Sequence, residues 1–484
     1  MINLLIKWTI KVIIVLLVIL STVILVRAFE ARRFPDLSNW HRPLIDSEFS
    51  ADTSVTITNL EEYFELEEKV FAEIDREIYQ SHSSNELLPL SRYSNGSRVD
   101  PKNFDRNWNR SFELMPNQIR GGVLMIHGLT DSPYSMRHLA NFFQSHGFYV
   151  LALRMPGHGT IPGELIDATW QDWMAATKMG AKHVRSKLKL NQPLHIVGYS
   201  NGGALAVKYA LDAIVEPNLP KPDKLILLSP MLGVTFFSRF TDWHKVLSWI
   251  PYFEKFRWLN VLPEFDPFKY NSFPKAAGKQ TFLLTREINR QLSKFTKTGE
   301  IEQLPPILTF QSLVDATVLT SAIVERLYNR IVLNNSELVL FDVNRLSKVD
   351  EFLTHRHNEL YNRITQAKDV SYTLTIVTNV NKDSRQVVAK TWANQTSIQT
   401  NESLNLEWPS KIFSLSHVAI PFPEHDDVYG AQESNTQNDN FNLGTFSPRG
   451  ERGILTVPIH MLMRLRYNPF YSYMEQRILD AVEE

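Results

Sequence analysis

The hydrophobic pattern changes twice within residues 1–115. An apolar run from Val12 to Val26 gives way to a polar stretch, and residues 60–79 then carry apolar side chains at helical spacing, at Tyr63, Val70, Phe71, Ile74 and Ile78. No pair of small residues marks a cleavage site after the run, so we expect an N-terminal transmembrane helix over residues 1–29 rather than a cleaved signal peptide. Residues 30–115 are interpreted as a polar stalk followed by a packing helix.

From residue 116 to about residue 470, short apolar runs alternate with segments of 3.6-residue periodicity. The runs are GVLMIHG, FYVLALRMPGHG, LHIVGYSNGG, KLILLSP, PILTFQS and ELVLFDVN. Continuous apolar strands that alternate with helices indicate an α/β fold, with a mostly parallel, doubly wound sheet covered on both faces. In such sheets, ligands bind beyond the carboxyl ends of the strands.

Two long stretches interrupt the alternation. Residues 231–304 are rich in aromatic side chains and lie between two expected strands, which predicts a cap insertion. Its aromatic residues line an acyl pocket or form the core of the cap. Residues 345–410 contain the strand-like SYTLTIVTNV between polar stretches and predict a further β-containing insertion. Residues 471–484 are expected to form a C-terminal helix or tail.

Charge and cysteine content narrow the classes of function. Lys and Arg total 51 and Asp and Glu total 52, so the chain lacks the basic character of a nucleic-acid binder. The sequence contains no Cys, which excludes disulfides, thiolate zinc sites and cysteine nucleophiles. No metal or organic cofactor is expected.

One serine stands where an apolar run turns into a helical pattern. Gly198-Tyr199-Ser200-Asn201-Gly202 matches G-x-S-x-G, the sharp strand-to-helix elbow that exposes a serine nucleophile. The pattern alone is weak, since a serine in a tight turn satisfies it too. A serine nucleophile also needs a histidine base, a carboxylate that orients this base, and N–H donors for an oxyanion.

Candidates for the oxyanion donors and the carboxylate follow from chain order. The N–H of Asn201 follows the nucleophile, and Leu129 lies in the loop after an early strand. Asp315 stands just beyond the run PILTFQS and before a helical pattern, where it is the expected carboxylate or else caps that helix. Asp342, at the end of ELVLFDVN, is the reserve candidate.

His417 is the expected base, because it follows an apolar run and comes after Asp315 in the chain. His425 lies among acidic residues in what is interpreted as a solvated turn. Four other histidines are assigned to other roles: His355 and His357 to a surface helix, His127 to structural hydrogen bonding, and His158 to the rim of the site.

Five motifs, in the required order, resemble the α/β-hydrolase superfamily: LMIHGLTDSPYSMRHLA, LALRMPGHGTIPGELIDATWQDWMAA, VGYSNGG, LTFQSLVDATV and SLSHVAIPFPEHDDVYG. The similarity is to the branch of bacterial carboxylesterases, monoacylglycerol lipases and lysophospholipases, often labelled serine aminopeptidase-like. It covers about residues 115–235 and 300–430. It implies a nucleophile at Ser200, its partners at Asp315 and His417, and oxyanion donors at Leu129 and Asn201. The N-terminal anchor and the long insertion before His417 depart from the compact esterases of this branch.

We therefore expect a membrane-anchored serine hydrolase that cleaves carboxylic esters, of acylglycerol or lysophospholipid type, through an acyl-enzyme. The alternatives are a serine peptidase or thioesterase with the same triad, and a non-catalytic membrane scaffold. The expected location is a bacterial inner membrane, with a single N-terminal span and the catalytic domain outside the cytosol.

Overall fold

The structure is a computed structural model. It describes residues 2–32, 35–80, 90–233, 251–313, 315, 318–346, 355–366, 370–393, 399–409, 414–431, 442–443 and 466–483.

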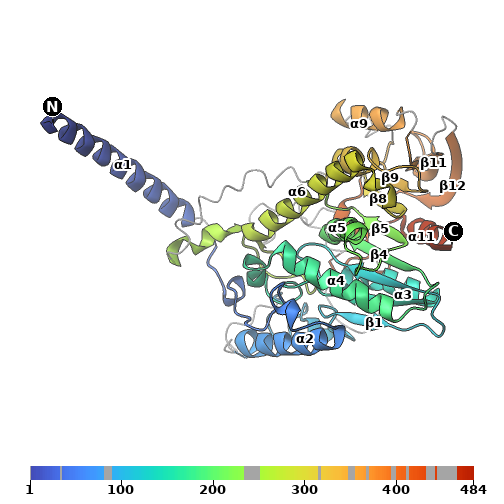
Figure 1. The fold of residues 1–484 in the computed structure, drawn as a ribbon, viewed down its shortest axis with the longest axis horizontal. Helices are drawn as coiled ribbons and strands as arrows, with labels where there is room; N and C mark the ends of the chain where they lie inside the picture. The colour runs from blue at the N-terminus through green and yellow to red at the C-terminus, as the bar shows by residue number, and fades with distance from the viewer. Residues whose placement is uncertain are drawn as a thin grey trace.

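A ten-stranded sheet in the order β1-β3-β2-β4-β5-β8-β9-β10-β11-β12 forms the centre of the molecule (Figure 1). All neighbouring pairs from β3 to β10 are parallel, and only the outer strands β1, β11 and β12 pair antiparallel. The predicted α/β-hydrolase fold with a mostly parallel sheet is confirmed. The strands are β1 Phe112–Leu114, β2 Gly121–Ile126, β3 Phe148–Leu153, β4 Leu194–Tyr199, β5 Lys224–Leu228, β8 Ile307–Ser312, β9 Glu337–Phe341, β10 Thr373–Asn379, β11 Gln386–Trp392 and β12 Gln399–Glu407.

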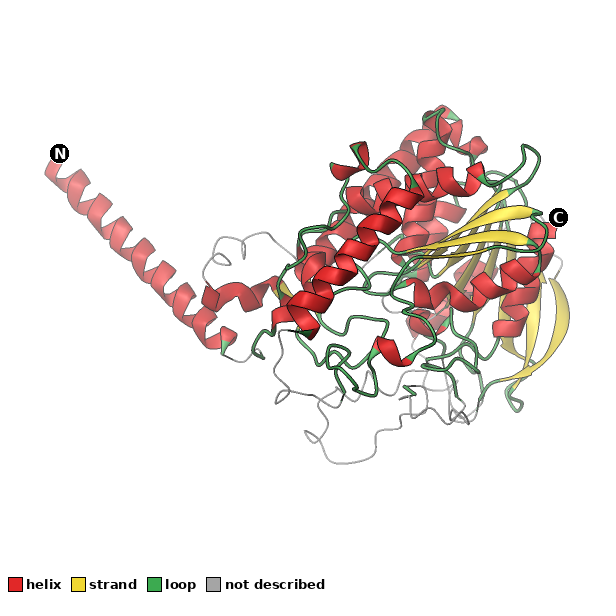
Figure 2. Ribbon diagram, turned by 90° about the horizontal axis from the view of Figure 1, so that it is seen from below, coloured by secondary structure: helices red, strands yellow, loops and turns green. Residues whose placement is uncertain are grey.

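Helices cover both faces of this sheet, which is why the central strands are apolar throughout (Figure 2). In β2, Leu124 and Ile126 join the core under one layer, while Val123 and Met125 join the core under the other. The first layer contains α4 (Trp170–Ser186), α5 (Asn201–Val215) and α6 (Lys275–Thr298), and the second contains α3 (Arg137–Ser145) and α11 (Tyr471–Glu483).

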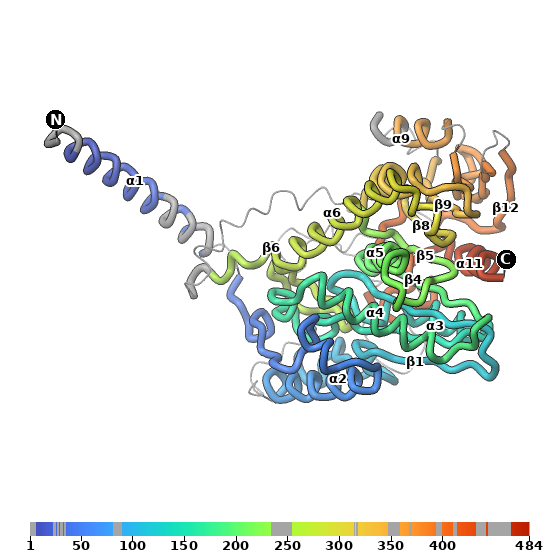
Figure 3. Tube along the Cα trace, in the orientation of Figure 1, coloured from blue at the N-terminus to red at the C-terminus, as the bar shows by residue number. Residues whose placement is uncertain are grey.

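The N-terminal residues form one long helix, α1 (Ile2–Ala31), which extends away from the rest of the molecule (Figure 3). Within the part of the chain that the structure describes, no helix is both long and apolar enough to cross a membrane. The uncharged run from Val12 to Val26 is shorter than the roughly 20 residues that span hydrocarbon, and Lys7 and Lys11 precede it. The predicted N-terminal transmembrane helix and membrane anchor are therefore wrong, and so is the single-pass inner-membrane location.

The segment interpreted as a stalk packs against the hydrolase domain. Trp40 and Phe49 are buried, and α2 (Leu60–Ile74) follows, with the Asn59 side chain accepting the N–H of Glu62 at 2.9 Å. The buried Arg154, which follows β3, pairs with Glu48 and Glu67 of this segment, each at 2.9 Å.

The two predicted insertions differ in how they relate to the sheet. In residues 231–304, the described part includes β6 (Trp258–Asn260), β7 (Phe273–Pro274) and α6, which packs on α5. Its aromatic residues Trp258, Phe265 and Phe268 are buried, and those within 234–250 lie outside the described residues. In residues 345–410, α9 (His355–Thr365) leads to β10, which pairs with β9. The strands β11 and β12 follow, so all three strands of this insertion extend the main sheet.

Candidate active site

Ser200 occupies a strained turn between β4 and α5. Its φ of 53° and ψ of −113° lie outside the regions that ordinary residues adopt, as expected for a nucleophile elbow. The turn is tight because α5 starts directly against β2: a Cβ on Gly202 would lie 2.1 Å from the Ile126 carbonyl oxygen. The two glycines of the motif are therefore steric requirements, since a Cβ on Gly198 would meet the Gly202 carbonyl oxygen at 2.5 Å.

Backbone hydrogen bonds hold the elbow at the carboxyl edge of the sheet. The N–H of Ser200 donates to the Leu228 carbonyl at 2.8 Å, and the Ser200 carbonyl accepts from the Met231 N–H at 2.9 Å. Both partners lie at or just after the end of β5, so the position of Ser200 depends on two neighbouring strands.

Asp315 and His417 meet at the same edge, although they are far apart in the sequence. Asp315 follows β8, and its Oδ2 atom lies 3.0 Å from Nδ1 of His417 and accepts the His417 backbone N–H at 3.1 Å. The Asp315 side chain is 2 % exposed and that of His417 is 12 % exposed. Oδ1 of Asp315 accepts the N–H of Val318 at 2.9 Å, so the carboxylate also caps the chain that follows it. The carboxylate therefore contacts both His417 and the chain that leads into α7 (Thr320–Ile323), and its catalytic role stays a prediction.

The structure describes Ser200 and His417 but contains no hydrogen bond between the Ser200 hydroxyl and the His417 ring. Catalytic hydrogen bonds are often long in the absence of substrate and shorten when it binds. The elbow and the Asp315–His417 pair thus lie at the same edge of the sheet.

The two predicted oxyanion donors lie in the loop after β2 and at the start of α5. Leu129 is in a turn closed by the Asp131 N–H, which donates to the Gly128 carbonyl at 3.2 Å, and Thr130 in that turn has a φ of 65°. Asn201 is the first residue of α5, where N–H groups lack intrahelical acceptors and the helix dipole favours negative charge. The roles of Leu129 and Asn201 as oxyanion donors stay predictions.

The histidines that were not expected to be the base have other hydrogen-bond partners or lie in other parts of the structure. His127 accepts the Met155 N–H at its Nε2 atom and contacts the Gly128 carbonyl through Nδ1, and burial lowers its pKa well below the ordinary value. His158 is buried beside it, which lowers the pKa of His158 to about 4. His425 is exposed, and His355 and His357 lie on α9.

Asp342, the reserve candidate for the carboxylate, contacts residues other than His417. It is fully buried, forms an ion pair with Arg345 and accepts from the Thr378 hydroxyl at 2.8 Å. Asp315, not Asp342, is the carboxylate that contacts His417.

Two residues that contact the segment of the oxyanion turn were not singled out from the sequence. Asp426 lies in the segment interpreted as a solvated turn, yet its side chain is fully buried. The backbone N–H of Tyr270, from the described part of 231–304, donates to the Thr130 carbonyl in the oxyanion turn at 2.8 Å. Most of their partners are more than a hundred positions away, so local spacing gives little signal of them; the exceptions are the N–H groups of Val428 and Tyr429, which donate to Asp426.

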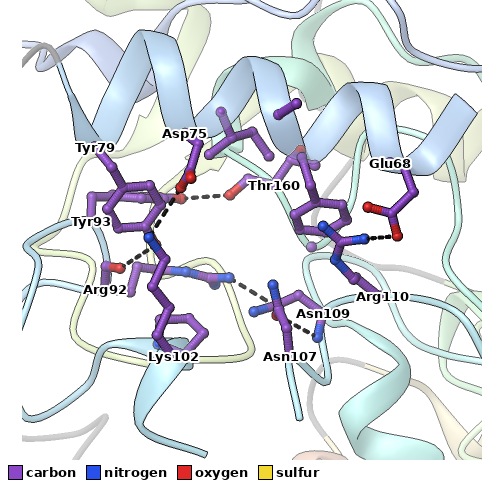
Figure 4. Close-up of a pocket in the computed structure, with 15 residues that line it drawn as sticks. Glu68, Asp75, Tyr79, Arg92, Tyr93, Lys102, Asn107, Asn109, Arg110 and Thr160 are labelled. Carbon is purple, nitrogen blue, oxygen red and sulfur yellow. Dashed lines mark hydrogen bonds and ion pairs between the residues drawn. The ribbon is translucent and has the colours of Figure 1, made fainter.

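A separate pocket of about 330 Å³ lies between α2 and the loop at Gly159 and Thr160 (Figure 4). None of the five candidate residues lines it. Its cationic side chains already have partners, in the pairs Lys102–Asp75, Arg110–Glu68 and Arg92–Asn109. The pocket is therefore not part of the candidate catalytic centre.

Comparison with known proteins finds a matching family and similar hydrolases. Residues 117–342 match the family described as "Serine aminopeptidase, S33". A thermostable monoacylglycerol lipase from Bacillus sp. (strain H-257) is 35 % identical over 89 residues, which is 18 % of this chain and 34 % of the relative. A carboxylesterase from Bacillus subtilis (strain 168) is 26 % identical over 108 residues, 22 % of this chain and 43 % of the relative. The matches thus span less than half the length of these relatives.

Among solved structures, the monoacylglycerol lipase of Paleococcus ferrophilus is 20 % identical, with 48 % of this chain and 88 % of that chain covered and a TM-score of 0.36. This score is too low to add to the argument. The family match and the two Bacillus relatives confirm the resemblance to the esterase and lipase branch of the α/β-hydrolase superfamily.

Proposed function

We propose that this protein is a serine hydrolase that cleaves carboxylic esters through an acyl-enzyme. The observation that carries the proposal is the contact between Asp315 and His417 at the edge where the strained Ser200 emerges. The family match and the printed names of both Bacillus relatives support the same class of activity.

In the proposed reaction, Nε2 of His417 takes the proton of the Ser200 hydroxyl as the oxygen attacks the ester carbonyl. The carboxylate of Asp315 holds the ring through Nδ1 and stabilises the imidazolium that forms. The N–H groups of Leu129 and Asn201 bind the tetrahedral oxyanion, and His417 then protonates the leaving alcohol. Water activated by His417 releases the acid and regenerates Ser200.

For the substrate, we propose an acylglycerol or a lysophospholipid-like ester. The name of the thermostable monoacylglycerol lipase supports an acylglycerol. The description of the matching family as a serine aminopeptidase makes a peptidase the second candidate, because the same triad can attack an amide.

Labelling with a fluorophosphonate probe tests the nucleophile. We expect the wild type to label and Ser200→Ala and His417→Ala to remain unlabelled, with all three shown to be folded by circular dichroism. Matched ester, thioester and amide substrates then separate the candidates through their kcat/KM values. A wild type that does not label and cleaves none of the three would refute the proposal and favour a non-catalytic scaffold.

A further inference from the structure

Two segments around the candidate site meet at one buried carboxylate, Asp426, and a third segment packs against both of them. The base segment (residues 414–431) carries His417, the oxyanion segment (residues 128–138) carries Leu129, and the cap segment (residues 264–272) lies against both. The proposed reaction assigns no role to Asp426.

Asp426 receives hydrogen bonds from two of these segments. From the oxyanion segment, the Tyr134 hydroxyl donates to Oδ1 at 3.0 Å, Nη2 of Arg137 donates to Oδ2 at 3.0 Å, and Nε2 of His138 lies 2.9 Å from Oδ2. From its own segment, the N–H groups of Val428 and Tyr429 donate to Oδ1 at 2.9 and 2.8 Å. Five donors therefore surround one carboxylate.

The charge of Asp426 is an essential part of this arrangement. Burial alone raises the pKa of a carboxyl group, but the hydrogen bond from His138 and the charge of Arg137 outweigh burial here and lower the pKa of Asp426 to about 2. The carboxylate is thus ionised at neutral pH, and charge-assisted hydrogen bonds of this kind are the strong ones.

The cap segment contacts the base segment and the oxyanion segment, each through a separate interaction. The Tyr429 hydroxyl donates to Oδ1 of Asp266 at 2.6 Å, and the ring of Phe268 stacks on that of Tyr134 with centroids 4.1 Å apart. Together with the bond from Tyr270 to Thr130, these contacts connect the cap segment to the base segment and to the oxyanion turn.

We propose that Asp426 is a positioning residue, which joins the segment that carries the base to the segment that carries an oxyanion donor and thereby sets their relative positions. This inference rests on the proposed function. It follows from connectivity: Tyr134 lies five residues after Leu129 and Asp426 lies nine residues after His417, so the hydrogen bond between them links the two segments directly. A misplacement of about 1 Å between such groups costs on the order of a hundredfold in rate.

The test compares Asp426→Asn with Asp427→Asn. Both carboxylates contact Nη2 of Arg137, but the Asp427 side chain is 65 % exposed. We expect Asp426→Asn to lower kcat on a soluble short-chain ester by about 10- to 100-fold with little change in KM, and Asp427→Asn to match the wild type. Active sites are titrated with a fluorophosphonate, so kcat refers to folded enzyme alone.

A purely structural role predicts a lower Tm for Asp426→Asn with kcat per titrated site unchanged, and that result overturns the inference. If Asp426→Asn does not fold, Tyr134→Phe removes one donor to the same carboxylate and keeps the ring. A lowered kcat of this variant supports the inference, and an unchanged kcat contradicts it. If the wild type is inert toward every ester, the proposed function fails, and this inference fails with it.

Discussion

Nδ1 of His417 lies 3.0 Å from Oδ2 of Asp315, and the same oxygen accepts the backbone N–H of His417 at 3.1 Å. Asp315→Asn keeps the shape of the side chain but removes the charge that selects the tautomer and stabilises the imidazolium. We expect kcat to fall by about 10³- to 10⁴-fold with KM nearly unchanged. Steady-state kinetics on a soluble ester measures both constants.

Asp342→Asn is the matched control for this prediction, because Asp342 is equally buried at the end of the neighbouring strand β9 but contacts Arg345 and Thr378. It should lower stability and leave kcat per titrated site close to the wild-type value. A large loss of kcat in Asp342→Asn, with Asp315→Asn active, would reassign the carboxylate.

Gly202→Ala tests the steric requirement at the elbow. The added Cβ would lie 2.1 Å from the Ile126 carbonyl oxygen, so the helix or the strand must move, and we expect a loss of at least about 2 kcal/mol in the free energy of unfolding. Gly299→Ala is the control for backbone strain without a clash: its φ of 87° disfavours alanine, whereas Gly202 lies in α5 without a positive φ, and no atom lies within 4 Å of the Cβ added at Gly299. It should cost only about 1 kcal/mol. Urea unfolding compares the two, and equal losses would contradict the packing argument.

Arg154→Met should detach the N-terminal segment from the hydrolase domain. The side chain of Arg154 is 1 % exposed and pairs with Glu48 and Glu67, so its removal leaves two carboxylates without their cation. We expect a loss of about 3 to 5 kcal/mol and faster proteolysis within residues 35–58.

Arg110→Met removes an ion pair with Glu68, whose side chain is 72 % exposed, and should cost at most about 1 kcal/mol. Proteolytic patterns followed by mass spectrometry distinguish the two variants. An unchanged pattern for Arg154→Met would show that the segment is held by other contacts.

The free energy of unfolding should depend on pH because of the buried carboxyl group of Glu164. Its burial raises the pKa from 4.5 to about 8, although Oε1 accepts the N–H groups of Leu44 and Ile45. Because the folded-state pKa lies above the unfolded one, the stabilisation is complete below about pH 4.5 and is lost as the pH rises toward 8. Glu164→Gln keeps the acceptor oxygen and cannot ionise, so it should not share this loss, which is on the order of 3 kcal/mol or less. Urea unfolding at pH 5 and pH 8 measures it, and parallel losses in both proteins would exclude Glu164 as the cause.

The strands β2, β3, β4, β5, β8 and β9 could be predicted from the sequence because strands buried on both faces must be apolar throughout. Leu124 and Val123 face opposite cores, yet both had to be hydrophobic, and the same holds along each central strand. The elbow was also visible, since the sharp turn at Ser200 demands glycine at fixed positions. The N-terminal prediction failed because hydrophobic character alone does not establish a stretch long enough to cross a membrane.

The sequence by itself determined the fold class and the chemistry available to it: a parallel sheet, a serine on an elbow, and carboxylate and histidine candidates in a fixed order. Local spacing carries most of this information, since each strand and the elbow lie within about ten residues and the order of the candidates can be seen along the chain. Only the tertiary structure decided that Asp315 rather than Asp342 contacts His417 and that Asp426 is buried at a junction of segments. These outcomes depend on contacts between residues roughly 100 to 300 positions apart, which no local pattern encodes.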